Sequence, residues 1–171
     1  MTEKNDTSML TEKYIFRNIR QEEIAQTSEI EKICFPPNEA CSYEHMEDRV
    51  KKAPELFLVA EDRATGKIAG FLNGLATDRE HLTDDFFTDA EMHDPKGKNI
   101  MLLGLDVLPK YQHQGLAREL VRCYKEREKV NGREKLILTC LPDKVEMYQK
   151  FGFKDHGIGD SVWGGEAWHE M

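Results

Sequence analysis

The sequence lacks a long uninterrupted hydrophobic stretch, and it has fewer basic than acidic residues. Its 171 residues include 24 Lys and Arg against 32 Asp and Glu, which gives a formal net charge of −8. The apolar run that begins at Ile100 is too short to span a bilayer, and the polar N-terminus does not resemble a signal peptide. Contacts with a nucleic-acid backbone require an excess of Lys and Arg. The composition therefore argues against membrane and nucleic-acid partners and predicts a cytoplasmic protein.

Cysteine is also scarce. The four cysteines, Cys34, Cys41, Cys123 and Cys140, lack the paired C-x-x-C spacing of a zinc site. Cys123 and Cys140 fall within a predicted helix and a predicted strand, where a free thiol behaves as a small hydrophobic side chain. We therefore expect no metal site and reduced thiols.

The length of 171 residues fits a single domain. The polar residues 1–12 are expected to form a flexible N-terminal segment, and residues 13–171 to form the domain. No internal repeat divides the chain. The acidic charge is compatible with a cationic substrate such as an amine, but solubility alone also explains it. The sequence leaves both a monomer and a homodimer open.

The stretch from Asn99 to Ala117 has the pattern of a buried strand, a turn and the start of a helix. Residues 99–108 are almost continuously apolar, and Pro109 ends this strand. From Leu116 the apolar positions have helical spacing, and Asn131-Gly132 suits the end of the helix. The turn between them places unpaired amide groups at the positive end of the helix dipole. This arrangement predicts an anion site, most naturally for phosphate, although an ordinary tight turn has the same pattern.

The remaining pattern alternates helices and strands, as in an α/β protein. The predicted strands are 14–19, 56–60, 68–75, 136–140 and 161–170, with a further strand entered at Phe153. The predicted helices are 20–34, which Pro36-Pro37 ends, 42–52, for which Ser42 is the N-cap, and 142–150. A hairpin signal, Thr65-Gly66-Lys67, joins the strands 56–60 and 68–75.

Residues 76–98 form a long polar and acidic connection that contains Phe86 and Phe87, and a short helix is expected near 83–90. Two interpretations have equal weight. The segment is either a lid whose carboxylates attract an amine, or a solvated surface excursion whose phenylalanines pack on the core. For Trp163 and Trp168, packing in the core or at an edge is favoured over lining an acceptor pocket.

Two motifs carry a resemblance to a known family. Gln112-x-x-Gly115-x-Ala117, after a strand that ends Leu105-x-Val107, resembles the acyl-CoA pyrophosphate loop of the GNAT superfamily of N-acetyltransferases. Tyr148-x-x-Phe151-Gly152-Phe153 resembles the later helix–strand junction of that superfamily. Within it, the chain is most similar to the arylalkylamine (serotonin-type) N-acetyltransferases and their bacterial relatives. The residues behind that finer similarity are Cys140, eight positions before Tyr148, and the motif Cys34-Phe-Pro-Pro-x-Glu39-Ala-x-Ser42.

The resemblance covers roughly residues 14–168 and implies both a fold and a cosubstrate. The implied fold is α/β (α+β), a GNAT fold with a single mixed central sheet of about seven strands flanked by helices, and with a splayed central strand pair that receives acyl-CoA. The implied cosubstrate is acetyl-CoA, with no metal. The residues implied to bind it are Leu105, Val107, Gln112, His113, Gln114, Gly115, Leu116 and Ala117.

The implied reaction is direct transfer of an acetyl group from acetyl-CoA to a small primary amine, of arylalkylamine or polyamine type, in a ternary complex. Tyr148 matches the tyrosine of the family that lies near the CoA sulfur and donates a proton to the leaving thiolate. The alternatives are a protein or peptide N-acetyltransferase with the same CoA site, and a non-catalytic CoA-binding protein.

The sequence departs from the vertebrate enzymes where they carry a histidine pair, because Met101 and Leu103 occupy the matching positions. The general base is therefore left open among Glu39, His45, His93 and a water chain. Asp106 lies on the same strand, but alternation turns it to the opposite face, where a surface or capping role is expected. A second departure is Leu141, which stands where many members of the superfamily place an Asn.

Overall fold

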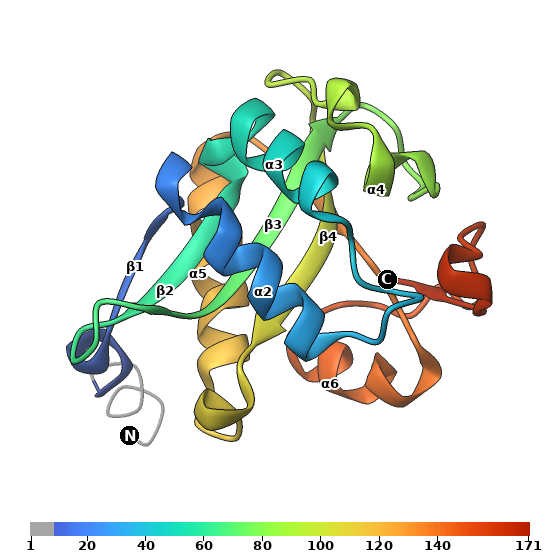
Figure 1. Cartoon of the computed structure of the whole chain (residues 1–171). Helices are drawn as coiled ribbons and strands as arrows, with labels where there is room; N and C mark the ends of the chain where they lie inside the picture. The colour runs from blue at the N-terminus through green and yellow to red at the C-terminus, as the bar shows by residue number, and fades with distance from the viewer. Residues whose placement is uncertain (1–8) are drawn as a thin grey trace.

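The structure, a computed structural model, describes residues 9–171 and contains a five-stranded mixed sheet (Figure 1). In spatial order its strands are β1 (Tyr14–Asn18), β2 (Phe57–Asp62), β3 (Ile68–Thr77), β4 (Asn99–Val107) and β5 (Lys135–Ile137). Neighbouring strands are antiparallel except for β4 and β5, which are parallel. The expected hairpin is formed by β2 and β3. The mixed sheet and its strand order confirm the GNAT fold that the motifs implied.

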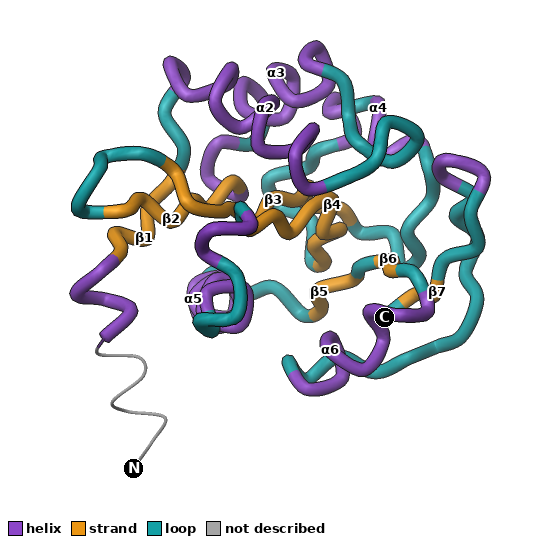
Figure 2. Tube along the Cα trace, turned by 60° about the horizontal axis from the view of Figure 1, so that its bottom comes forward, coloured by secondary structure: helices purple, strands orange, loops and turns teal. Residues whose placement is uncertain are grey.

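Helices cover both faces of this sheet (Figure 2). α2 (Ile24–Cys34) and α3 (Tyr43–Lys52) pack on one face, and α5 (Leu116–Val130) packs on the other. Successive strand residues divide between the two cores, so that Phe71 faces α2 and α3 whereas Leu72 faces α5. As a consequence, a side chain on a central strand meets a helix whichever face it points to.

The sheet is interrupted beyond β5, which corrects the expectation of one continuous sheet. β5 pairs with β4 only over Asn99–Met101. The next residue, Leu138, exchanges backbone hydrogen bonds of 2.9 and 2.8 Å with Met171 instead. It leads into β6 (Thr139–Cys140), which pairs with β7 (His169–Glu170) in a separate two-stranded sheet. The described chain therefore has its seven strands in two sheets, and β4 is left with a free edge beyond the short pairing.

The irregularity of β4 also begins where this pairing ends. The register between β3 and β4 shifts between Asn73 and Gly74, so that Leu103 has no partner on β3. A bulge of this kind bends the strand and increases its twist. This bulge and the short pairing of β4 with β5 are consistent with the splayed pair that the resemblance implied.

The predicted connection 76–98 is ordered and contains α4 (Asp85–Thr88) and a 3-10 turn (Ala90–Met92), in place of one helix over 83–90. Phe86 is completely buried in the core, whereas Phe87 is only partly buried. α6 (Val145–Lys150) lies within the predicted helix 142–150, the first residues of which form a 3-10 turn.

The C-terminal segment contains much less strand than the sequence predicted. In place of a strand over 161–170 it has a 3-10 turn (Trp163–Gly165) followed by β7. Gly164 and Gly165 have φ angles of +65° and +79°, which an extended strand does not allow. The strand expected at Phe153 is replaced by an isolated bridge between Ile158 and His169.

The predicted flexible segment 1–12 lies partly outside the described residues, which begin at residue 9. Residues 9–13 are helical, and Leu10 packs into the core. In the described part of the chain, no helix combines the length and the apolar character needed to cross a membrane.

Candidate active site

The candidate site is a cavity of about 660 Å³ along the free edge of β4. One end lies at the N-terminus of α5, and the other end lies against α2, α3 and the segment 35–41. The residues of β4 and β6 border its middle. Motifs that are far apart in the sequence therefore share one cavity, because the interruption of the sheet leaves room between β4 and β6.

The turn before α5 has the geometry of an anion site. Gly115 is the N-cap residue with a φ angle of +83°, and His113 is in the left-handed region with a φ of +62°. Gly115, Leu116 and Ala117 line the cavity, and so do Gln112 and His113. The first amides of α5 have no partner within the helix, and they lie at the positive end of its dipole. This end of the cavity is therefore suited to a phosphate group.

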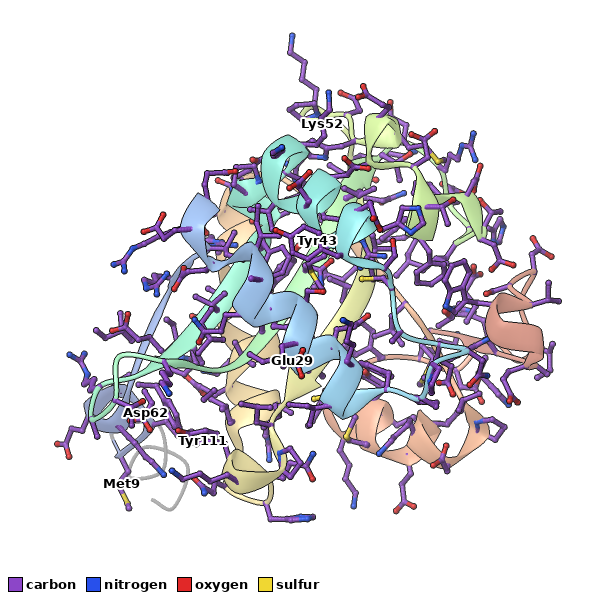
Figure 3. All side chains as sticks on the ribbon, in the orientation of Figure 1. Met9, Glu29, Tyr43, Lys52, Asp62 and Tyr111 are labelled. Carbon is purple, nitrogen blue, oxygen red and sulfur yellow. The ribbon has the colours of Figure 1, made fainter. Side chains whose placement is uncertain are left out.

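The turn is fixed to the sheet by Tyr111, which ends the 3-10 turn Pro109–Tyr111. Its hydroxyl donates a 2.7 Å hydrogen bond to Asp62 Oδ2 at the end of β2 (Figure 3). Gln112 Nε2 donates to the carbonyl of Val107 at 3.0 Å. These bonds hold the turn against β2 and β4.

Gln114 differs from the other predicted CoA-binding residues. Its side-chain oxygen accepts hydrogen bonds from Lys13 Nζ at 2.8 Å and from the hydroxyl of Tyr14 at 3.2 Å. It is not among the described residues that line the cavity. The structure therefore assigns the side chain of Gln114 to holding the turn against β1.

Leu105 and Val107, two of the predicted CoA-binding residues, line the cavity from β4. The carbonyl of Val107 is already engaged, because it accepts from Gln112 Nε2 at 3.0 Å and from Cys34 Sγ at 3.4 Å. The free edge of β4 can accept an extended ligand by strand addition, in which the ligand replaces the missing neighbour strand.

Tyr148 lies on α6 and faces the same cavity. Its ring makes near-perpendicular contacts with Phe151 at 6.0 Å and Phe153 at 5.8 Å. Burial, followed by the charges of Cys140 and Asp106, raises the pKa of the Tyr148 hydroxyl. Tyr148 is therefore protonated at neutral pH and able to donate a proton.

Two of the candidate bases are placed elsewhere. His93 Nδ1 accepts from the amide of Ala76 at 3.0 Å, and His93 Nε2 lies 2.8 Å from Glu55 Oε1. Both ring nitrogens of His93 therefore have structural partners. His93 directly follows the 3-10 turn Ala90–Met92, and His45 lies on α3. Neither histidine is found among the described residues that border the cavity.

Glu39 does line the cavity. Burial, followed by the charges of Glu166 and Asp143, raises the pKa of its carboxyl group. Trp163 Nε1 donates to the carbonyl of Glu39 at 2.8 Å, so the segment that carries Glu39 is tied to the C-terminal part of the chain.

Asp106 corrects the sequence prediction most directly. Its side chain is 0% exposed, and it is neither a surface nor a capping residue. Alternation was assigned correctly next to Asp106, which pairs with Phe71 while Leu105 pairs with Leu72, but the bulge at Leu103 reverses it toward Met101, which pairs with Leu75. The error lay in assuming that the opposite face was solvated, whereas α2 covers it. Asp106 meets the carboxyl group of Glu31 on α2, a residue that the sequence analysis had not singled out.

The sequence analysis did not assign the aromatic side chains that line the cavity at its end near α2. The rings of Phe87 and Trp163 stack with centroids 5.0 Å apart, and Trp168 borders the cavity beside them. Both tryptophans line the cavity, and Trp168 is also buried in the core, as the favoured prediction had it. Asp84 accepts hydrogen bonds from Ser161 Oγ at 2.5 Å and from the amide of Val162 at 3.1 Å. The segment 76–98 and the C-terminal segment are thus joined over the cavity.

In residues 9–171, no cluster of three or more His, Cys, Asp or Glu side chains is arranged to hold a metal ion.

Comparison with known proteins supports this assignment of the fold. The profile of the family described as acetyltransferase (GNAT) family matches residues 24–153. A curated relative, the probable hydrolase YhcX of Bacillus subtilis (strain 168), is 27% identical over 158 residues, which cover 88% of this chain. The chain spans only 30% of the length of that relative.

Two solved structures are similar in fold. The GphF GNAT-like decarboxylase in complex with isobutyryl-CoA has a TM-score of 0.74 and 18% identity, with 91% of this chain and 96% of that chain covered. The putative acetyltransferase yncA from Salmonella typhimurium, with its cofactor acetyl-CoA, has a TM-score of 0.62 and 15% identity, with 92% of each chain covered. At these identities the similarity concerns the fold.

Proposed function

Because the chain belongs to the acetyltransferase (GNAT) family, we propose that it transfers the acetyl group of acetyl-CoA to a small primary amine. The observation that carries the proposal is the single cavity that joins a phosphate-binding helix terminus, the free edge of β4 and the hydroxyl of Tyr148. Arylalkylamines and polyamines are the acceptor classes that we would test first.

Acetyl-CoA would bind along β4. Its pyrophosphate would take the amides at the start of α5, and its pantetheine arm would lie in extended form beside Leu105 and Val107. This placement directs the thioester toward Tyr148. Holding the two reactants side by side removes much of the entropy cost of the bimolecular reaction.

Tyr148 would supply the proton that the leaving thiolate needs. Its raised pKa keeps the phenol protonated, and no hydrogen bond within the described residues occupies its hydroxyl. The proton is therefore free to move to the CoA sulfur as the carbon–sulfur bond breaks.

The covered α2 end of the cavity supports a small acceptor over a protein. The segments 35–41, 84–87 and 161–163 meet there through Asp84, Trp163 and their hydrogen bonds. The aromatic wall of Phe87, Trp163 and Trp168 offers contact area for the apolar part of an amine.

The test is calorimetric titration with acetyl-CoA, followed by an assay of thiol release with tryptamine, phenethylamine, spermidine and a lysine-containing peptide. We expect micromolar binding and release with at least one small amine. Thiol release only with the peptide would show that the acceptor is a peptide or protein instead of a small amine. An absence of acetyl-CoA binding would refute the proposal.

A further inference from the structure

We propose that Glu31 and Asp106 form a carboxyl pair that recognises the acceptor amine, with Glu31 binding its ammonium group and Asp106 holding Glu31 in place. The inference rests on the proposed function and deepens it, since it names a cationic amine as the group recognised and locates its binding site. Glu31 would be a catalytic residue that touches the substrate, and Asp106 a positioning residue.

The two carboxyl groups are both buried, and they are short of partners. Asp106 is 0% and Glu31 is 4% exposed. Within the described residues, no N–H or O–H donor forms a hydrogen bond to either side-chain oxygen of Asp106 or to Oε1 of Glu31. Glu31 Oε2 accepts from the amide of Cys41 at 3.1 Å. Leaving buried acceptors unpaired is costly, so the pair needs a proton between its members and a donor from outside.

The proton of the pair belongs to Asp106. Burial, followed by the charge of Glu31 and a hydrogen bond to it, raises the pKa of Asp106 well above its usual range. Two carboxylates in contact in an apolar site do not both ionise. Asp106 is therefore the neutral, protonated member of the pair, and its O–H is placed to bond to Glu31.

Of the two carboxyl groups, that of Glu31 is the one that borders the cavity. It belongs to the cavity lining, whereas Asp106 lies behind it and is not among the described lining residues. A Cβ added at Gly104 would lie 3.2 Å from Asp106 Oδ1 and 3.7 Å from Glu31 Oε1, so the small residue leaves room in front of the pair. The unpartnered Oε1 of Glu31 is itself buried, so an ammonium group would reach it once the Glu31 side chain turns toward the cavity that it borders.

Arg49, the buried cation of this region, does not neutralise Glu31. Its Nη2 donates to the carbonyl of Phe87 at 2.9 Å, and its Nη1 lies 3.5 Å from Asn73 Oδ1. The ion pairs of the described residues include none between Arg49 and a carboxylate. The charge of Glu31 is therefore left for a ligand, and a cationic amine has the complementary charge.

The pair also lies close to the reacting groups. Glu31 and Tyr148 border the same cavity. An ammonium at Glu31 would give one proton to the carboxylate, and its nitrogen would then attack the thioester carbon. As the carbon–nitrogen bond forms and the carbon–sulfur bond breaks, the amine loses a second proton and Tyr148 protonates the sulfur. Tyr148 regains its proton by taking up this second proton. Glu31 passes the first proton to solvent, so one proton is released per turnover.

The test compares Glu31→Gln with Asp106→Asn. Glu31→Gln keeps the acceptor for the Cys41 amide but removes the charge, so we expect kcat/KM for the amine to fall about 100-fold or more, with acetyl-CoA binding unchanged. Asp106→Asn replaces the O–H donor by an N–H donor and keeps the charge on Glu31, so we expect kcat/KM within about fivefold of the unmodified protein. Equal melting temperatures would show that both variants fold.

The pH profile separates chemistry from structure. The groups that face the pair are Cys34 from α2, Cys41 from the segment after α2, Arg49 from α3, Tyr148 from α6 and the neutral Asn73 from β3. Because Glu31→Gln has no carboxylate to take the ammonium proton, it must use free amine, and its kcat/KM should keep rising up to the pKa of the amine. The unmodified protein and Asp106→Asn should instead reach a plateau at lower pH.

Full activity of Glu31→Gln would overturn the inference, and so would a loss in Asp106→Asn as large as that in Glu31→Gln. A failure of the unmodified protein to acetylate any amine would instead overturn the proposed function. The two failures are therefore distinguishable on the same set of samples.

Discussion

Substituting Gly115 tests the phosphate site through charge alone, provided that Asp and Asn are compared at this position. Gly115 has a φ angle of +83°, which both residues tolerate better than most and at a similar cost. A Cβ added there meets only Leu10 Cδ1, at 4.0 Å, so neither side chain is excluded by packing. The two variants differ essentially by one negative charge at the start of α5.

The magnitude follows from Coulomb's law. A unit charge about 4 Å from a phosphate charge costs about 1 kcal/mol in water and about 4 kcal/mol at an effective dielectric constant of 20. Gly115 is exposed, and solvent therefore screens the repulsion. We expect a penalty of about 1–3 kcal/mol, which corresponds to a Kd for acetyl-CoA about 5- to 150-fold higher in Gly115→Asp than in Gly115→Asn.

The assay is calorimetric titration of both variants at low and high ionic strength. The difference between them should shrink at high salt, because counterions screen the added charge. Equal acetyl-CoA affinities for Gly115→Asp and Gly115→Asn at low salt would refute the assignment, since no phosphate would then lie near the turn.

Two further substitutions test the reacting groups. Tyr148→Phe removes the proton donor and should lower kcat about 100-fold while leaving acetyl-CoA affinity unchanged, as measured by steady-state kinetics and calorimetry; an unaltered kcat would remove Tyr148 from the mechanism. Asp106→Asn should flatten the pH dependence of stability. The folded-state pKa of Asp106 is raised above its usual value of 3.8, so its contribution is fully present below that pH and is lost as the pH rises toward the folded pKa. Urea unfolding at pH 5 and pH 8 should therefore show a smaller loss of stability in the variant, and an identical loss would contradict a protonated Asp106.

The local motifs of the site were predictable from sequence. The turn from Gln112 to Ala117 and the short helix of Tyr148 are each formed by a few consecutive residues. Gly115 indicates the turn, and the apolar spacing of α5 indicates the helix that follows it. The structure brings these segments to one cavity, as the spacing of the two motifs implied.

The carboxyl pair was not predictable in the same way, because its members are far apart in the sequence. Only the packing of α2 on β4 brings Glu31 to Asp106. One signal was present: Asp106 interrupts an almost continuously apolar run, and a charged residue in a buried strand conflicts with its surroundings. Such conflicts are frequent at functional sites.

The division into two sheets was also beyond the sequence patterns. Residues 136–140 were predicted as one strand, yet Leu138 changes the partner of the chain from β4 to Met171. Both arrangements satisfy the same backbone groups, so hydrophobic pattern alone does not choose between them. The final strand was overestimated for a local reason, since Gly164 and Gly165 take positive φ angles.

The change of partner at Leu138 has a consequence for the cooperativity of the molecule. The five-stranded and two-stranded sheets share few backbone hydrogen bonds, and they meet mainly at this residue. A ligand that lies along β4 as an added strand would bridge the gap, so that opening one sheet would require releasing the other. We expect acetyl-CoA to slow amide hydrogen exchange in β6 and β7 as well as at the start of α5. Protection confined to α5 would show that the ligand touches the helix terminus without bridging the sheets. Bound acetyl-CoA would thus turn two local opening units into one, and part of its binding energy would appear as resistance of the whole domain to unfolding.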